Sequence, residues 1–361
     1  MKIVFNYEIF ALQRYGGISR YYVELARAMK NRAQQVKIVA PYFINRYLAE
    51  ENEELVVSLK PMRLIRNRYI DLSPKLNYWY TEYFLKKMKV EICHQTYYTN
   101  DLTRNKAVKK VITIHDMIYE LFPEDLPELD HIIACKKKYI EAADLIIAVS
   151  ENTKNDLIRM YPVAKDKTTV VHHGVDPALY RNAKAYKTEK PYLLYVGNRA
   201  GYKNFGMLTD LYTEREALHK NYALICFGGG KFTEEEAAKA AQTGILQLEG
   251  DDGLLAALYK GAALFVYPSA YEGFGMPVLE AMAAGCPVVC MNSSSLPEVA
   301  GNAAFYCNEN TKEAMTKVVM HALENEQERK AMIEKGLERV RTFTWDACAE
   351  KTLAAYQTLL N

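Results

Sequence analysis

Short apolar runs alternate with amphipathic stretches along most of the chain, and this pattern predicts alternating β-strands and α-helices. In the first half the predicted strands are residues 2–6, 36–40, 91–94, 110–114, 145–149 and 168–172. Between the first two, a glycine turn leads into a predicted helix, whose apolar face carries Tyr21, Leu25, Ala28 and Met29. Residues 78–88 and 132–142 are further predicted helices, and residues 45–72 form a charged, irregular stretch.

The second half repeats the same alternation. Its predicted strands are residues 192–196, 223–227, 245–248, 262–268 and 288–290. Its predicted helices are residues 234–242, 254–260, 311–325, 327–341 and 345–360. A lysine-rich run without periodicity, residues 182–190, predicts a linker between the halves. Alternating strands and helices on both sides of one linker predict an α/β protein with two doubly wound parallel sheets.

Composition agrees with two domains and excludes some classes of protein. The chain has 361 residues, and half of them are hydrophobic. This length is too great for one ordinary hydrophobic core and sufficient for two domains. The formal net charge is only +2, so nucleic acid is not an expected partner. The first half carries more basic than acidic residues. This excess suits an anionic partner such as a membrane surface, although ordinary surface variation explains it equally well.

The cysteines and the N-terminus predict the compartment. Seven cysteines are scattered without the spacing of disulfide frameworks or zinc sites, so neither a disulfide nor a metal is expected. The first ten residues are interrupted by Asn6 and Glu8 and do not form a signal peptide. No apolar run reaches the length of a membrane span. We therefore expect a reduced, cytoplasmic location.

The sequence EGFGMPVLE, residues 272–280, is the most informative stretch for function. It follows a predicted strand, and Pro277 stands where a helix can begin, so it predicts a strand, a glycine-rich turn and a helix. The unpaired N–H groups and the dipole of the helix N-terminus favour an anion. Glu272 and Glu280 would repel an anion unless they accept hydrogen bonds from hydroxyls. A ligand with both phosphates and sugar hydroxyls meets both conditions.

The other candidate residues also lie at the carboxyl ends of predicted strands, where ligands of such sheets bind. His115 and the Gly16-Gly17 turn belong to the first predicted sheet, and Arg199 and Lys203 belong to the second. If the two sheets face each other, these residues line opposite walls of one cleft. Neither glycine turn has the G-x-G-x-x-G pattern, so a dehydrogenase fingerprint is missing.

Several of these segments together resemble a known family. YVGNRAGYKN, EGFGMPVLE, GCPVV followed by SSSLPEVAG, VVHHGVD and ITIHD resemble the retaining glycosyltransferases of family 4, the glycosyltransferase group 1 type. The resemblance implies the GT-B fold, with two facing Rossmann-like domains. It implies a first domain of residues 1–182, joined by a crossover helix within residues 343–361, and a donor-binding domain of residues 190–342. It also implies a nucleotide-sugar substrate with no cofactor and no metal ion.

The resemblance assigns roles to individual residues. Arg199 and Lys203 match the basic pair that holds the diphosphate, and Glu280 matches the carboxylate that binds the ribose hydroxyls. Glu272 matches the carboxylate facing the donor sugar, and His115 matches a histidine near its reacting carbon. The remaining donor-binding positions are backbone positions in glycine-rich turns: Gly16, Gly17, Gly197, Gly273, Phe274, Gly275, Met276 and Pro277.

The implied function is the retaining transfer of a hexose from a nucleoside diphosphate sugar to a glycan or lipid-linked acceptor in cell-surface polysaccharide synthesis. The form of the GNRAGYKN loop favours mannose and GDP-mannose, with a UDP-sugar as the alternative. Two carboxylates also suggest a glycosidase, but both lie in one short stretch with cations nearby, and a diphosphate leaves without a general acid. A nucleotide-sugar 2-epimerase of the same fold and a non-catalytic nucleotide-sugar binding protein remain alternatives.

Some residues have simpler interpretations. Ser150 is expected to cap a helix and Asp116 a loop. Tyr271 stacks on the donor or packs internally, and His172 and His173 receive no role. The helix of residues 78–88, with Lys86, Lys87 and Lys89, either rests on a membrane interface or packs on the core with solvated lysines; packing is favoured.

Overall fold

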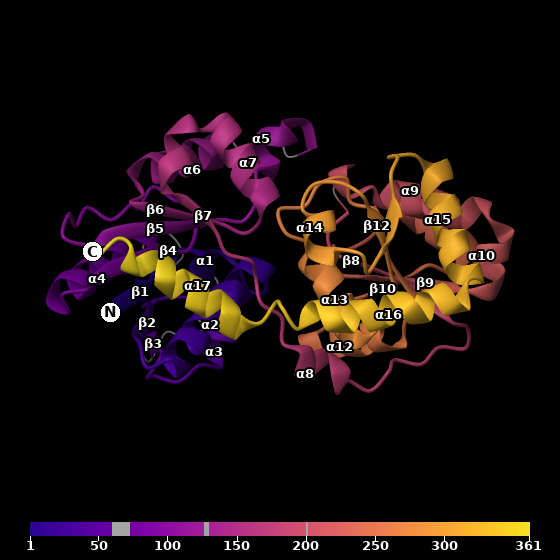
Figure 1. Cartoon of the computed structure of the whole chain (residues 1–361), viewed down its shortest axis with the longest axis horizontal. Coiled ribbons are helices and arrows are strands. Elements are labelled where there is room, and N and C mark those ends of the chain that lie inside the picture. The colour runs from indigo at the N-terminus through magenta and orange to yellow at the C-terminus, as the bar shows by residue number, and fades with distance from the viewer. Residues whose placement is uncertain (60–72, 126–129, 200) are drawn as a thin grey trace. The chain divides into compact units, whose positions relative to one another are not determined.

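The computed structural model describes residues 1–59, 73–125, 130–199 and 201–361. They form two compact units, residues 1–174 with 345–361, and residues 175–344 (Figure 1). The first unit ends earlier than the sequence predicted, and residues 182–190 are no linker between the units. The reason is that α8 (Pro177–Arg181) packs on α12 (Asp252–Gly261) and α13 (Met276–Ala284) of the second unit. Part of the predicted irregular stretch, residues 60–72, lies outside the described residues.

The first unit is built on a seven-stranded sheet in the order β3-β2-β1-β4-β5-β6-β7. All its strand pairs are parallel, with Ile3 of β1 opposite Ile92 of β4. The strands are β1 (Lys2–Phe5), β2 (Gln35–Val39), β3 (Val56–Val57), β4 (Ile92–Gln95), β5 (Lys109–Ile114), β6 (Leu145–Ala148) and β7 (Thr168–Val170). Six match predicted strands. β3 was not predicted, because two residues are too few to show a period.

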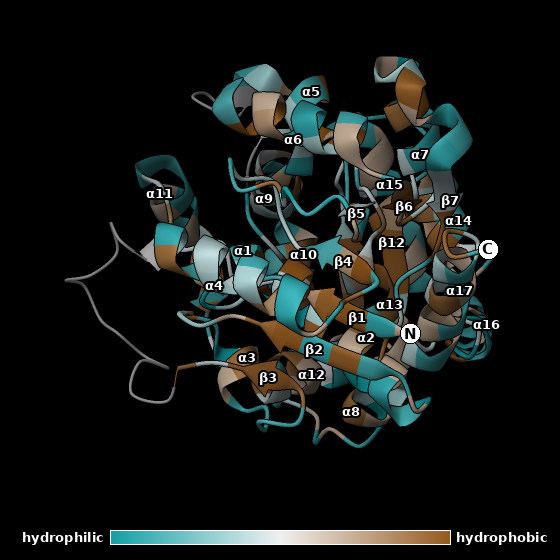
Figure 2. Ribbon diagram, turned by 90° about the vertical axis from the view of Figure 1, so that its left-hand side faces the viewer, coloured by the Kyte–Doolittle hydropathy of each residue, from teal (hydrophilic) through white to brown (hydrophobic). Residues whose placement is uncertain are grey.

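Helices cover both faces of this sheet, as βαβ crossovers require. Along β1, Ile3 and Phe5 pack in the core cluster of α2 and α17, whereas Val4 packs with Leu85 of α4 on the other face. Figure 2 shows β1 and β2 mostly brown, as expected for strands with two covered faces. The helices are α1 (Glu8–Leu12), α2 (Gly17–Asn31), α3 (Arg46–Ala49), α4 (Ser73–Lys87), α5 (Ile118–Leu121), α6 (Asp130–Ala142), α7 (Glu151–Met160) and α17 (Trp345–Gln357), with 3-10 turns η2 (Pro123–Asp125) and η3 (Pro162–Lys167).

The C-terminal helix α17 returns to the first unit and packs along α2, as the resemblance implied (Figure 1). Its buried face includes Cys348, Ala349 and Tyr356. The Tyr356 hydroxyl forms a hydrogen bond with Nδ1 of His94, which is fully buried at the centre of the sheet. The last segment of the chain therefore completes the core that the first segment begins.

The second unit has a six-stranded parallel sheet in the order β10-β9-β8-β11-β12-β13. Its strands are β8 (Tyr192–Val196), β9 (Ala223–Phe227), β10 (Leu246–Leu248), β11 (Leu264–Tyr267), β12 (Val288–Met291) and β13 (Phe305–Cys307). Besides α8, α12 and α13, its helices are α9 (Phe205–Glu214), α10 (Glu216–Asn221), α11 (Glu234–Thr243), α14 (Leu296–Ala300), α15 (Lys312–Glu324) and α16 (Glu326–Val340), with the 3-10 turn η4 (Gly201–Lys203). The short elements β13 and α14 were not predicted.

The strand order of the second unit reverses between β8 and β11. The chain leaves β8 toward β9 on one side and leaves β11 toward β12 on the other, while Leu193 and Leu264 pair between them. The loops after β8 and β11 therefore diverge from neighbouring strand ends, the geometry at which open α/β sheets bind ligands. Residues 197–199, 201–204 and 268–275 occupy this position.

Candidate functional site

A buried ion pair joins the two loops that follow β8 and β11. Lys203 Nζ lies 2.5 Å from Glu272 Oε1, and the two side chains are only 10% and 9% exposed. The hydroxyl of Tyr267, the last residue of β11, lies 3.4 Å from the same Nζ. Charges this deeply buried persist only with a partner. Lys203 and Glu272 therefore act as one unit, although the sequence analysis assigned them separate roles.

Backbone hydrogen bonds hold these two loops together. The carbonyl of Tyr202 in η4 accepts a bond of 2.8 Å from the amide of Ala270. Asn204 adopts a left-handed conformation, with φ of 52°, and its side-chain amide donates to the carbonyl of Pro268 at 2.9 Å. Lys203 lies between Tyr202 and Asn204, so these two contacts position its side chain next to Glu272.

The glycine-rich turn has the predicted strand–turn–helix geometry. Gly275 has φ of 102°, in a region that favours glycine, and a Cβ there would lie 2.8 Å from Leu296 Cδ2. Helix α13 begins at Met276, with Pro277 in its first turn. Glu280, one turn further along, is 6% exposed and accepts a hydrogen bond from Tyr259 of α12 at 3.3 Å. The two carboxylates of the stretch thus have different partners.

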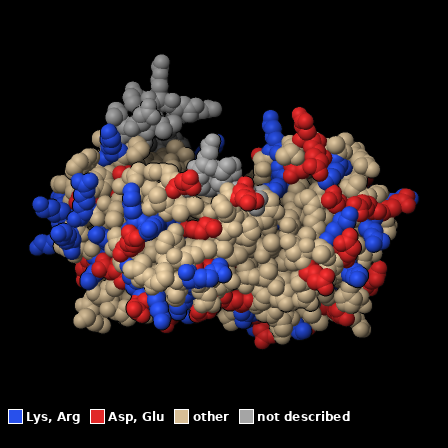
Figure 3. Space-filling model, turned by 90° about the horizontal axis from the view of Figure 1, so that it is seen from above, with Lys and Arg blue, Asp and Glu red and all other residues tan. Residues whose placement is uncertain are grey.

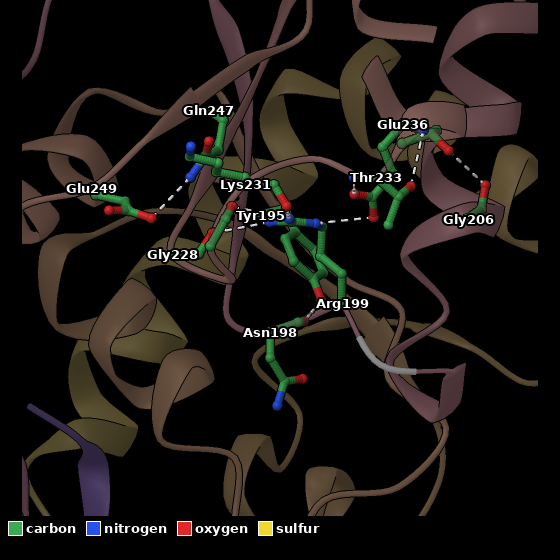
Figure 4. A network of polar contacts seen from close by, with 12 residues as sticks. Tyr195, Asn198, Arg199, Gly206, Gly228, Lys231, Thr233, Glu236, Gln247 and Glu249 are labelled. Atoms are coloured by element: carbon green, nitrogen blue, oxygen red, sulfur yellow. Dashed lines mark hydrogen bonds and ion pairs between the residues drawn. The ribbon is translucent and has the colours of Figure 1, made fainter. Parts of the chain in front are cut away.

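Arg199 is held by a separate network (Figure 4). Its Nε donates to Glu236 Oε1 at 2.9 Å, and its Nη1 and Nη2 donate to the carbonyls of Gly228, Gly230 and Lys231 at 2.7 to 3.0 Å. The side chain is 6% exposed. Among the described residues, Arg199 and Lys203 share no hydrogen-bond partner. A ligand that takes a bidentate bond from Arg199 must therefore displace some of these contacts.

The glycine loop after β9 is shaped around this arginine. Gly228, Gly229 and Gly230 all have positive φ, between 73° and 80°. A Cβ on Gly229 would lie 2.5 Å from Arg199 Nη1 and 2.8 Å from the carbonyl oxygen of Gly197. Gly197 itself has φ of 130°. Arg199, Gly197 and this loop therefore form one tightly fitted structure at the carboxyl edge of the second sheet.

The remaining candidates belong to the first unit. Gly16 precedes α2 and Gly17 is its first residue, with open space where a Cβ would stand on Gly17. The ring of His115 stacks on that of His173, with centroids 5.5 Å apart and an angle of 19° between the planes. His115 Nε2 has no hydrogen-bond partner among the described residues. Burial lowers the pKa of His115 to about 3, so its imidazole is neutral at neutral pH.

The simpler interpretations of two residues are confirmed. Ser150 caps α7 by accepting a bond from the amide of Thr153 at 3.0 Å. Asp116 accepts a bond from the amide of Ile118 at 3.1 Å. His173, to which the sequence assigned no role, belongs to the aromatic cluster of His115, Tyr21 and Trp345. The VVHHGVD segment gave no hint of this contact, because it depends on strand order.

The buried histidines predict that stability falls in acid. Burial lowers the pKa of His94 and His115 to about 3, and that of His173 well below its usual value of 6.5. At these three positions the unfolded chain therefore binds more protons than the folded chain below pH 6.5. Each histidine lowers the free energy of unfolding by up to about 1.4 kcal/mol per pH unit as the pH falls toward 3. Glu8 opposes them, because burial raises its pKa to about 7 and favours folding as the pH falls from 7 to 4.5.

Because three histidines lower the stability in acid and one carboxyl raises it, the free energy of unfolding should fall overall as the solution is acidified. We expect a lower unfolding temperature at about pH 5.5 than at about pH 7, and a weaker pH dependence in His94→Gln. Thr316→Val supplies the control, because it removes a buried hydroxyl without removing a titratable group and should leave the pH dependence of the unfolding temperature unchanged. If the unfolding temperature depended on pH equally in His94→Gln and in the unaltered protein, the lowered pKa of His94 would be contradicted.

Sequence reasoning missed two sets of residues around the site. Glu236 orients Arg199 and also completes a capping box with Thr233 at the start of α11. Ser293, Ser294 and Ser295 contact the glycine-rich turn from the loop after β12. The T-x-x-E pattern of residues 233–236 signals a capping box, but nothing local to it points to Arg199.

Comparison with known proteins covers nearly the whole chain. The family profile "Glycosyltransferase Family 4" matches residues 15–179, and "Glycosyl transferases group 1" matches residues 178–339. The O-antigen chain mannosyltransferase B of Escherichia coli is 29% identical, over 95% of this chain and 96% of the relative. The O-antigen chain mannosyltransferase RfbU of Salmonella typhimurium is 26% identical, over 67% and 68%. The structure of sucrose-phosphate synthase from Thermosynechococcus elongatus superposes with a TM-score of 0.78 and 18% identity, over 99% of this chain and 98% of that one.

Proposed function

This chain belongs to the group 1, family 4 glycosyltransferases, and from that premise we propose that it transfers mannose from GDP-mannose to a growing cell-surface polysaccharide or its lipid-linked precursor, with retention of configuration. The observation that carries the proposal is the buried Lys203–Glu272 pair at the point where the strand order of the second sheet reverses. The mannosyltransferase names of relatives matched over most of their length support the choice of sugar.

The proposed roles follow from the chemistry at the second sheet. Lys203, with Arg199 after release from Glu236, holds the diphosphate and stabilises the negative charge that grows on it as the bond to the sugar breaks. Electrostatic stabilisation of this kind is usually the largest contribution to catalysis. When Lys203 pairs with the diphosphate instead of with Glu272, the carboxylate of Glu272 can accept hydrogen bonds from the donor sugar. Glu280, held by Tyr259, accepts the ribose hydroxyls.

The proposed chemistry needs neither a general acid nor a metal ion. A diphosphate is a stable leaving group, and the cationic side chains neutralise it. Retention results when the acceptor hydroxyl attacks from the face that the diphosphate leaves, which lets a phosphate oxygen take up the hydroxyl proton. Neutral His115 is proposed to contact the donor sugar, since its Nε2 has a hydrogen bond to give or accept.

The test is a donor panel. GDP-, UDP- and ADP-sugars are incubated with the purified protein, with and without lipid-linked and oligosaccharide acceptors, while nucleotide release and sugar identity are followed. GDP release from GDP-mannose, accelerated by acceptor and giving an α-linked product by NMR, is the expected result. Isomerised donor would replace the proposal with an epimerase, and binding without turnover would replace it with a non-catalytic binding protein.

We also propose that the first unit touches an anionic membrane surface through α4. The buried side of this helix carries the polar Asn77 and Thr81, and Asn77 exchanges two hydrogen bonds with the backbone of Tyr42. Its outer side carries Leu76, Trp79 and Tyr83, which are 49%, 67% and 57% exposed. An apolar outer face beside lysines is typical of a helix in the membrane interface.

Basic residues surround this outer face. A depression of about 810 Å³ beside α4 is lined by Trp79, Tyr83 and basic side chains, together with Glu82 and Glu91. The basic residues are Lys86, Lys89, Arg104 and Lys106. Figure 3 shows Lys and Arg side chains gathered at the left edge, where Figure 1 places α4. Within the described part of the chain, no helix combines the length and apolar composition needed to cross a bilayer.

Binding to vesicles tests this surface. Each lysine near an anionic surface contributes about 1 kcal/mol, so Lys86→Glu with Lys89→Glu should weaken binding to phosphatidylglycerol vesicles by at least about tenfold. Trp79→Ala should weaken binding without changing its dependence on salt. Lys137→Glu with Lys138→Glu, on the exposed side of α6, is the matched control. Equal sedimentation of all variants, or equal binding to phosphatidylcholine, would contradict the proposal.

A further inference from the structure

Three consecutive serines hold the glycine-rich turn in place. The hydroxyl of Ser293 donates to the carbonyl of Ala270 at 2.8 Å. Ser294 Oγ accepts a bond of 2.9 Å from the amide of Glu272. The buried hydroxyl of Ser295 lies 2.8 Å from the carbonyl oxygens of both Glu272 and Phe274. The serines thus bind the backbone on both sides of the Glu272 side chain.

Two of these serines depart from the local conformation or hydrogen bonding that is usual for serine at their positions. Ser294 has φ of 51°, in the left-handed region that residues other than glycine, asparagine and aspartate rarely adopt. Ser295 is the N-cap residue of α14, yet its hydroxyl makes no capping bond because it serves the turn instead. Departures from local preference of this kind persist where surrounding contacts compensate, and they cluster at functional sites.

From these contacts we infer that Ser294 is a positioning residue for Glu272, with Ser295 in support. The bonds of both serines to Glu272 go to its backbone and not to the carboxylate that pairs with Lys203. They fix the peptide groups on either side of Glu272 Cα, and so fix the direction in which its carboxylate leaves the backbone. A residue that must exchange Lys203 for a sugar hydroxyl needs such a support, because a small misplacement at a site costs much of the rate.

The inference rests on the proposed function for its catalytic consequence, but its structural part can be measured separately. Ser294→Ala removes the acceptor and keeps the strained φ, whereas Ser294→Gly removes the acceptor and relieves the strain. Both should free the Glu272 amide, and only the first should lower stability clearly. Thr316→Val removes a hydroxyl that donates to Lys312 within α15 and is the matched control.

Hydrogen exchange followed by mass spectrometry over residues 268–276 is the first readout. We expect exchange at the Glu272 amide to quicken on the order of tenfold in both Ser294 variants and not in Thr316→Val. The second readout is nucleotide-sugar turnover. We expect kcat/KM to fall about tenfold in both variants, mainly through kcat, even though Ser294→Gly remains as stable as the unaltered protein.

The outcomes separate the inference from the proposed function. Unchanged exchange, or kcat/KM within about twofold of the unaltered protein in Ser294→Gly, overturns the positioning role. The positioning role is also overturned if kcat/KM falls only in Ser294→Ala, because the loss then follows thermal stability alone. If the unaltered protein turns over no nucleotide sugar, the proposed function fails, and faster exchange still supports the contact.

Discussion

Lys203→Met combined with Glu272→Gln is expected to fold with nearly unchanged stability and to lose most of its sugar transfer. The pair is buried, and replacing both charges of a buried ion pair by neutral groups of similar size is often neutral or stabilising. Transfer should nevertheless fall at least about a hundredfold, because the cation that neutralises the leaving diphosphate is lost. Urea unfolding and nucleotide release measure the two effects separately.

The single variants provide the contrast. Lys203→Met alone leaves the carboxylate of Glu272 buried without its cation, and Glu272→Gln alone leaves the ammonium group without its anion. Breaking one side of a buried pair costs about 3–5 kcal/mol. Each single variant should therefore be clearly less stable than the double variant. Single variants as stable as the unaltered protein, or a double variant that still transfers sugar, would contradict the role of the pair.

Arg199→Ala is expected to lower both stability and transfer. The guanidinium satisfies Glu236 and three backbone carbonyls of residues 228–231, and its removal leaves a half-buried carboxylate without its cation. A hydrogen bond to a charged group contributes about 1.5–3 kcal/mol, so the unfolding free energy should fall by at least that amount. Transfer should fall about a hundred- to thousandfold at saturating donor, if Arg199 binds the diphosphate as proposed.

Two comparisons show whether Arg199 acts on the donor or only on the loop. Lys239 on the neighbouring helix pairs with Asp210 and Glu235, so Lys239→Ala should cost at most about 1 kcal/mol and leave transfer intact. Glu236 accepts from Arg199 with Oε1 and from the Thr233 amide with Oε2, so Glu236→Gln keeps one oxygen acceptor, which can serve Arg199, and should retain more activity than Arg199→Ala. If Arg199→Ala loses stability but keeps its kcat, the arginine is structural and Lys203 alone serves the diphosphate.

Much of the architecture could be predicted from the sequence, because it depends on local patterns. The apolar runs that became β8 and β11, and the face of α2 with Tyr21 and Leu25, are periodic over enough residues to be recognised. β3 was missed because its two residues are too few to show a period. The domain boundary was wrong because α8 packs on helices far along the chain.

The site was predictable as a set of residues but not as an arrangement. Glycines, cations and carboxylates at strand ends marked Arg199, Lys203, Glu272 and Glu280 as candidates. The sequence did not indicate that Lys203 pairs with Glu272, or that Arg199 pairs with Glu236. Nor did it indicate the function of the serines, because Ser294 meets Glu272 only when β12 lies beside β11.

The sequence by itself thus determined the α/β class, the two sheets, the strand–turn–helix of residues 262–284 and the candidate residues. Periodicity and turn chemistry depend on neighbours along the chain, and these can be read directly. Only the tertiary structure decided the partners: Lys203 with Glu272, Arg199 with Glu236, and the serines with the turn. Those contacts depend on strand order, which places β8 between β9 and β11, and β12 on the other side of β11, although long segments of chain separate β8 from β11.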